Sequence, residues 1–153
     1  MERCLVMTEE QITKILLKEL ITFGWKIVCF DFPQSGTGVY IHPNITVSKN
    51  LNSFIPDIVA VKNNVCLFFE NKDRYEYSDF KKVNKLILSD DYSEDISRLL
   101  AQYKIDSIYY GIGIPSYCIT EKILANAYLV DFIIGVHSDT SISFYANQHN
   151  IIL

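Results

Sequence analysis

Two apolar runs separated by a pair of asparagines constrain the fold of this chain most strongly. Residues 58–61 and 65–69 are apolar throughout, and Asn63 and Asn64 lie between them. Asparagine tolerates the positive φ values of a two-residue hairpin turn, so we expect two antiparallel strands here. Because both faces of these strands are apolar, the hairpin should lie in the middle of a sheet that is covered on both sides.

The segments around the hairpin predict an α/β domain with a mixed sheet. Thr8 and Gln11 form a capping box ahead of an apolar stripe with three- and four-residue spacing, which predicts a helix over residues 8–23 that ends at Gly24. The strands and helices expected along the chain do not alternate strictly, as they would in a doubly wound fold. No repeat or linker is visible, so residues 1–153 are expected to form a single domain. Further strands are expected at 25–30, 39–47 (weak), 107–112, 130–136 and 142–145, and further helices at 78–88, 93–103 and 120–128.

Composition excludes several classes of protein. Of the 153 residues, 49% are hydrophobic, which is too many for a disordered chain. No apolar run approaches the ~18 residues of a membrane helix, so we expect no membrane partner. The net charge of −4 argues against a general nucleic-acid coat protein, but it leaves room for an enzyme that makes selective contacts. The four cysteines are Cys4, Cys29, Cys66 and Cys118. None of them forms a CxxC pair, so we expect no zinc knuckle. We also expect a reduced, cytoplasmic protein.

Charged residues gather at the open end of the predicted hairpin. With Asn63 and Asn64 as the turn, partner numbers sum to 127, so Asp57 faces Glu70 with Cβ atoms roughly 5 Å apart. Lys72 lies two residues beyond Glu70 and therefore on the same face. Charged side chains at the end of apolar strands need a partner of opposite charge, and a divalent cation would supply it for the two carboxylates. Oxygen ligands suit Mg²⁺, for which Mn²⁺ can substitute.

These residues also resemble a known family. Pro56-Asp57, followed after twelve residues by Glu70-Asn71-Lys72, looks like the PD-(D/E)XK motif of restriction-endonuclease-like nucleases. The resemblance implies an αβββαβ core, here with an extra C-terminal helix and strands. It also implies that Asp57, Glu70 and the Asn71 carbonyl bind Mg²⁺, and that Lys72 is the catalytic lysine of a Mg²⁺-dependent phosphodiesterase that cleaves DNA.

Many members of this family add an acidic residue from the first helix. Glu19 is the candidate here, because it falls inside the apolar arc of the predicted helix. The alternative is that Glu19 sits at the edge of that arc and reaches solvent. Glu9 and Glu10 are interpreted as charges favoured by the dipole at the helix start.

Contacts to DNA are predicted from a loop and from a basic segment. Ser35 lies in a loop of small residues whose backbone N–H groups could approach a phosphate, although a plain mobile loop is the alternative. Arg74, Lys81 and Lys82 belong to a local cluster of basic residues, which could equally be a solvated helix face. A second (D/E)xK triplet, residues 79–81, has no apolar strand before it.

Within the family, the small size favours a type II restriction endonuclease. Such an enzyme would act on duplex DNA as a homodimer, with one site for each strand, beside a cognate DNA methyltransferase. A Holliday-junction resolvase and a repair or phage nuclease are the alternatives with the same fold. A non-catalytic nucleic-acid-binding module is the alternative from another class.

Overall fold

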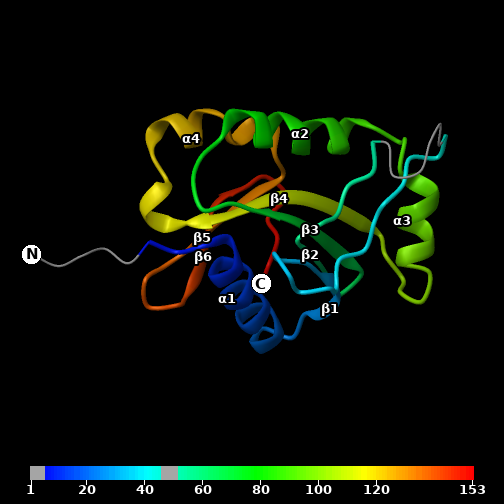
Figure 1. Cartoon of the computed structure of the whole chain (residues 1–153), viewed down its shortest axis with the longest axis horizontal. Coiled ribbons are helices and arrows are strands. Elements are labelled where there is room, and N and C mark those ends of the chain that lie inside the picture. Colours follow the sequence, from blue (N-terminus) through cyan, green and yellow to red (C-terminus); the bar gives the residue numbers. More distant parts are fainter. Residues whose placement is uncertain (1–5, 46–51) are drawn as a thin grey trace, which may run out of the picture.

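The computed structural model describes residues 6–45 and 52–153 as one six-stranded sheet with helices on both faces (Figure 1). The strands follow one another across the sheet in chain order. The helices are α1 (Glu9–Thr22), α2 (Tyr77–Leu88), α3 (Ser93–Leu99) and α4 (Glu121–Ala125), with 3₁₀ turns η1 (Ser116–Cys118) and η2 (Ala127–Leu129). The strands are β1 (Lys26–Phe30), β2 (Ile58–Lys62), β3 (Val65–Asn71), β4 (Ser107–Pro115), β5 (Phe132–Val136) and β6 (Ile142–Asn147).

The sheet combines antiparallel and parallel pairs. Strands β1, β2 and β3 form an antiparallel meander, and β5 pairs with β6 in the same manner. The two central pairs, β3 with β4 and β4 with β5, are parallel, because helices connect their strands. The prediction of an α/β domain with a mixed sheet is therefore confirmed.

The predicted hairpin and its register are confirmed. Asn63 and Asn64 adopt φ values of 48° and 66°, as a turn of this kind requires. Ile58 pairs with Phe69, and each later pair in the hairpin keeps the same sum of residue numbers. The paired residues end at Ile58 and Phe69, so Asp57 and Glu70 each lie one residue beyond the last pair.

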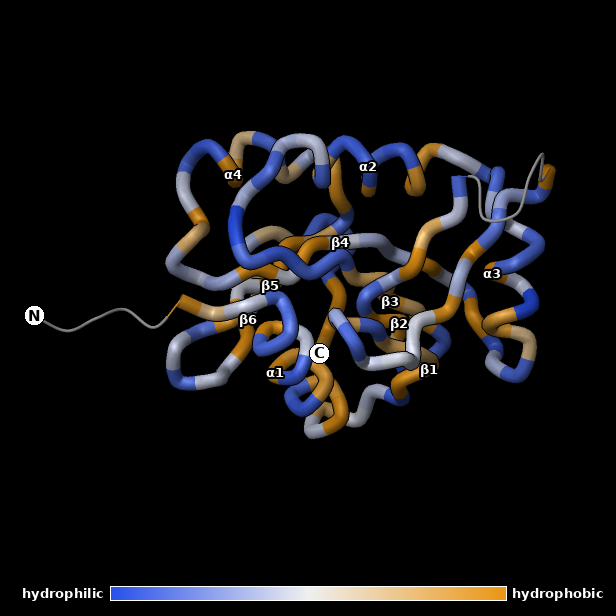
Figure 2. The backbone as a smooth tube through the Cα atoms, in the orientation of Figure 1, coloured by the Kyte–Doolittle hydropathy of each residue, from blue (hydrophilic) through white to orange (hydrophobic). Residues whose placement is uncertain are grey.

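Helices cover the two faces of the sheet unequally. The apolar stripe of α1 covers one face, and its residues Ile12, Leu16 and Leu20 are fully buried. Helices α2, α3 and α4 cover the other face (Figures 1 and 2), with Phe80 of α2 and Ile96 of α3 packed against the strands. The hairpin strands are thus covered on both sides, as their double apolar pattern predicts.

The predicted ends of α1 are confirmed, but the predicted strand over residues 39–47 is not. The predicted capping box at the start of α1 is present, and Gly24 ends that helix with φ +93°. The weak strand expected over residues 39–47 is wrong within the described residues, where Ile41 makes an isolated bridge to Phe54. Pro43 lacks the N–H that would continue such a strand. Residues 46 and 47 lie outside the described residues.

Two helices are shorter than predicted, and strands β3, β4 and β6 are longer. Helix α3 ends at Leu99, because the chain turns there towards β4. The helix expected over residues 120–128 divides into α4 and η2. Strand β4 extends to Pro115, three residues further than expected, between two parallel neighbours. In the described part of the chain, no helix has both the length and the apolar character needed to cross a lipid bilayer.

Candidate functional site

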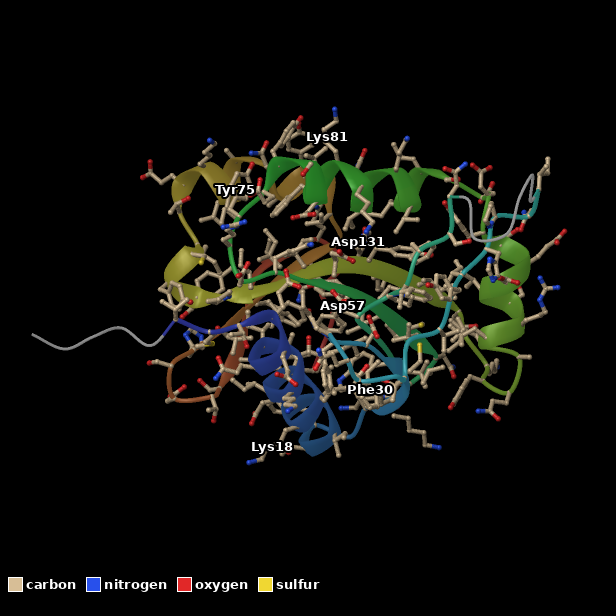
Figure 3. All side chains as sticks on the ribbon, in the orientation of Figure 1. Lys18, Phe30, Asp57, Tyr75, Lys81 and Asp131 are labelled. Carbon is tan, nitrogen blue, oxygen red and sulfur yellow. The ribbon has the colours of Figure 1, made fainter. Side chains whose placement is uncertain are left out.

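Two acidic residues meet where β2 begins and β3 ends. The backbone N–H of Asp57, just before β2, donates to the Phe69 carbonyl at 3.0 Å. The Asp57 carboxylate accepts the backbone N–H of Asn71 at 2.7 Å. Asp57 lies near the middle of the molecule, between the two helical layers (Figure 3). The geometry thus fixes Asp57 against the segment that carries Glu70.

The surroundings of Asp57 disfavour its charged form. Burial raises the pKa of this carboxyl most, and the nearby Glu70 carboxylate raises it further. The hydrogen bond from the Asn71 N–H lowers the pKa but does not compensate, so the net pKa is well above the ordinary value. A cation placed between Asp57 and Glu70 would therefore stabilise the ionised pair.

Two lysines contact the other carboxylate of the pair. The Glu70 side chain is 15% exposed, and its Oε1 lies 3.5 Å from the Nζ of Lys72 and 3.5 Å from the Nζ of Lys82. Lys72 directly follows the last residue of β3, whereas Lys82 comes from α2. Glu70 therefore lies where strand β3 meets the first half of α2.

Lys72 joins residues from three elements. Besides Glu70, its ammonium lies 3.5 Å from Asp79 of α2 and 3.9 Å from Glu9 of α1. Burial lowers the pKa of Lys72, but the three carboxylates outweigh burial and raise it above the ordinary value. Lys72 is therefore a protonated cation at neutral pH. We call Asp57, Glu70, Lys72, Glu9 and Asp79 the carboxylate–lysine cluster.

The first helix supplies Glu9, and not Glu19, to this cluster. Glu9 lies in the first turn of α1, beside Lys72. Glu19 lies ten residues further on, about 15 Å along the helix axis. The prediction that Glu19 faces the site therefore placed the acidic residue at the wrong end of the helix. Burial also raises the pKa of the Glu9 carboxyl, although Lys72 opposes this.

Asn71 is held between the sheet and α1. Its side-chain amide is buried and donates to the Thr13 hydroxyl at 3.0 Å, and its Oδ1 has no partner within the described residues. Gly113 on β4 leaves the space for this amide, since a Cβ there would lie 2.4 Å from Oδ1. In a strand the N–H and C=O of one residue point the same way, so the Asn71 carbonyl points to the side on which its N–H meets Asp57.

The oxygen atoms at this point suit Mg²⁺. The donors are the carboxylates of Asp57 and Glu70 and the carbonyl of Asn71. In the described residues, no cluster of three or more His, Cys, Asp or Glu side chains forms a metal cage. Mg²⁺ commonly binds through one or two carboxylates and keeps several waters, so it does not need such a cage. The residues present therefore fit Mg²⁺ better than a metal that needs a full set of side-chain ligands.

Of the residues predicted to contact DNA, Lys82 alone contacts a member of the cluster, Glu70. The Ser35 hydroxyl accepts the backbone N–H of Phe32 and donates to Asp31, both at 3.3 Å, so it stabilises its own loop. Arg74 pairs with a neighbouring glutamate on the surface. Lys81 is exposed on the outer side of α2, with its ammonium 5.8 Å from the centre of the Tyr77 ring (Figure 3). DNA binding by Ser35, Arg74 and Lys81 stays a prediction.

Besides Glu9, the sequence pattern did not identify two residues of this site, Asp79 and Thr13. Asp79 belongs to the second (D/E)xK triplet, and its position in the first turn of α2 brings it to Lys72. Thr13 is a buried polar residue within the apolar stripe of α1. A polar residue among positions that should be apolar was the available signal for Thr13. Asp79 gave no comparable signal, because acidic residues are common in the first turn of a helix.

No family model, no curated protein and no solved structure matches this chain. The geometry and charge of the carboxylate–lysine cluster therefore carry the functional assignment.

Proposed function

We propose that this chain is a metal-dependent endonuclease of the PD-(D/E)XK type, which hydrolyses phosphodiester bonds of DNA. The observation that carries the proposal is the convergence of Asp57, Glu70 and Lys72 at the adjoining ends of β2 and β3. The order α1, β1, β2, β3, α2, β4, with α3 added before β4, agrees with the αβββαβ core that the motif implies.

Different residues of the chain would have different roles in such a reaction. Asp57, Glu70 and the Asn71 carbonyl would hold Mg²⁺, which when bound lowers the pKa of a water molecule and polarises a phosphate oxygen. The ammonium of Lys72 would stabilise the negative charge that develops on the phosphate oxygens. Glu9 and Asp79 act as positioning residues, because they hold that ammonium beside Glu70.

The charge state of Lys72 favours an electrostatic role. A general base must be unprotonated near the working pH, and the surrounding carboxylates raise the pKa of Lys72 instead. A protonated lysine can orient a water or stabilise an oxyanion, and neither task requires it to lose its proton. We therefore assign Lys72 to charge stabilisation.

The resemblance suggests several forms of this activity. A type II restriction endonuclease would cut both strands of duplex DNA as a homodimer, together with a cognate methyltransferase. A junction resolvase or a repair or phage nuclease would use the same site on branched or damaged DNA. A non-catalytic binding module would retain the fold without the chemistry.

Cleavage of DNA by the purified full chain tests the proposal. Long mixed-sequence DNA, as duplex and with single-stranded tails, would be incubated with Mg²⁺, with Mn²⁺ and with chelator. We expect cleavage that requires the metal and is lost in Asp57→Ala. A folded protein that binds DNA but cleaves none of these substrates with either metal would support the binding module instead.

A further inference from the structure

A groove runs along the C-terminal half of α2 and begins beside Glu70. It encloses about 850 Å³ between α2 and the described residues on either side of the segment 46–51. That volume lies in the range of sites for small ligands.

Lys82 connects this groove to the carboxylate–lysine cluster. Its ammonium lies 3.5 Å from Glu70, and its side chain also lines the groove. Phe54 and Leu86 likewise line both the groove and the smaller pocket that contains Glu70. A phosphate that contacts Lys82 from the groove would therefore lie close to Glu70.

The lining of the groove combines cations with apolar and aromatic groups. Lys82 and Lys85 supply positive charge, against one acidic residue, Asp91. Amide and hydroxyl groups come from Asn44, Asn52, Ser53 and Asn84. Apolar and aromatic side chains come from Ile45, Phe54, Leu86, Leu88 and Tyr92.

Two of the apolar side chains are unusually exposed. Ile45 is 84% exposed and Leu88 is 79% exposed, and both line the groove. The half-buried rings of Phe54 and Tyr92, which also line it, form an edge-to-face pair with centroids 4.9 Å apart. Exposed apolar groups beside lysines are suited to a ligand that has flat apolar faces and negative charge.

We propose that this groove binds an unpaired DNA strand next to the scissile phosphate. Phosphates would contact Lys82 and Lys85, and unstacked bases would pack on Leu88 and Ile45. The faces of paired bases are stacked within a duplex and cannot reach these side chains. The inference rests on the proposed function and narrows its substrate to DNA that carries a single-stranded segment, as a repair or phage nuclease would require.

Binding measured in chelator isolates the groove from the chemistry. Fluorescence anisotropy of a short labelled oligothymidine, with the full chain, would be compared with a blunt duplex of equal length. We expect the single strand to bind about tenfold or more tightly. Lys85→Ala and Leu88→Ala should each weaken strand binding by about three- to tenfold, since the first removes a phosphate contact and the second an apolar surface for a base.

Exposed residues on the opposite face provide matched controls. Lys18→Ala removes the same charge from α1, and Ile21→Ala truncates an apolar side chain that is 59% exposed there (Figure 3). Both controls should leave strand binding unchanged. Circular dichroism would verify that all four variants fold. Equal losses in the control and groove variants, or tighter binding of the blunt duplex, would overturn the assignment of the groove.

Cleavage assays separate this inference from the proposed function. If cleavage depends on Mg²⁺ and Asp57 but is equally fast on blunt and single-strand-tailed duplexes, the endonuclease proposal stands and the groove assignment fails. If strand binding responds to Lys85→Ala and Leu88→Ala but no metal supports cleavage, the groove assignment stands and the endonuclease proposal fails.

Discussion

The side-chain amide of Asn71 donates a hydrogen bond to the hydroxyl of Thr13, with 3.0 Å between Nδ2 and Oγ1. The Thr13 hydroxyl in turn donates to the Glu9 carbonyl at 2.9 Å. These bonds join the end of β3 to the first turn of α1. The strand that carries Glu70 and Lys72 is thereby tied to the helix turn that carries Glu9.

Replacement of Thr13 by valine tests this connection. Thr13→Val keeps the shape of the side chain but leaves the buried Asn71 amide without a hydrogen-bond acceptor. We therefore expect the free energy of unfolding to fall by about 1–3 kcal/mol. Thr22→Val is the matched control, because its hydroxyl bonds to the Lys18 carbonyl on the exposed side of the same helix. That change should cost less than ~0.5 kcal/mol. Urea denaturation measures both, and equal losses would contradict the structural role of Thr13.

The raised pKa of Asp57 predicts how stability changes with pH. Between the pKa of an unfolded aspartate, about 3.9, and the raised native value, the native state binds more protons than the unfolded state. The free energy of unfolding therefore falls as pH rises through this window. Asp57→Asn removes the titration and can still accept the Asn71 N–H. In chelator, we expect the Tm of this variant relative to wild type to increase steadily from pH 4.5 to pH 8.

An aspartate with the opposite shift provides the control for that profile. Hydrogen bonds from Ser141 lower the pKa of Asp139, so Asp139→Asn should gain no advantage as pH rises. Addition of Mg²⁺ should raise the Tm of the wild type but not that of Asp57→Asn. If the melting profiles of wild type and Asp57→Asn run parallel across this pH range, Asp57 does not titrate as its surroundings require.

Removal of the Lys72 charge should impair catalysis without unfolding the protein. Lys72→Met keeps a long side chain but removes the cation beside Glu70, so we expect cleavage to slow by about 10²–10³-fold. Lys18→Met, an exposed change on α1, should cleave at the wild-type rate. Single-turnover cleavage measures both variants. Wild-type activity in Lys72→Met would exclude Lys72 from the reaction.

Glu9 and Glu19 of α1 provide a comparison within one helix. Glu9→Gln removes a carboxylate 3.9 Å from Lys72, so cleavage should slow by about tenfold, or ~1.4 kcal/mol. Glu19→Gln should change the rate less than twofold, because α1 carries that residue away from the cluster. The same cleavage assay ranks them. A larger effect at Glu19 would restore the original sequence-based prediction.

The hairpin shows what local sequence can determine. Asn63 and Asn64 fix the turn, and the turn length fixes the register of β2 against β3 from neighbouring residues alone. The carboxylates of Asp57 and Glu70, just beyond the paired residues, are close enough for Glu70 to raise the pKa of Asp57. The start of α1 was equally predictable, because Thr8 and Gln11 cap the helix through each other's backbone.

Only the tertiary structure decided which other residues reach the site. Glu9 and Asp79 both lie beside Lys72, although α1 and α2 pack on opposite faces of the sheet. The first turns of both helices lie near the end of β3, which Lys72 follows. The contact of Lys82 with Glu70 and the groove beside it depend on the same helix placement. Periodicity identifies the face of a helix that packs on a sheet, but the position of the helix along that sheet is set by contacts between residues far apart in sequence.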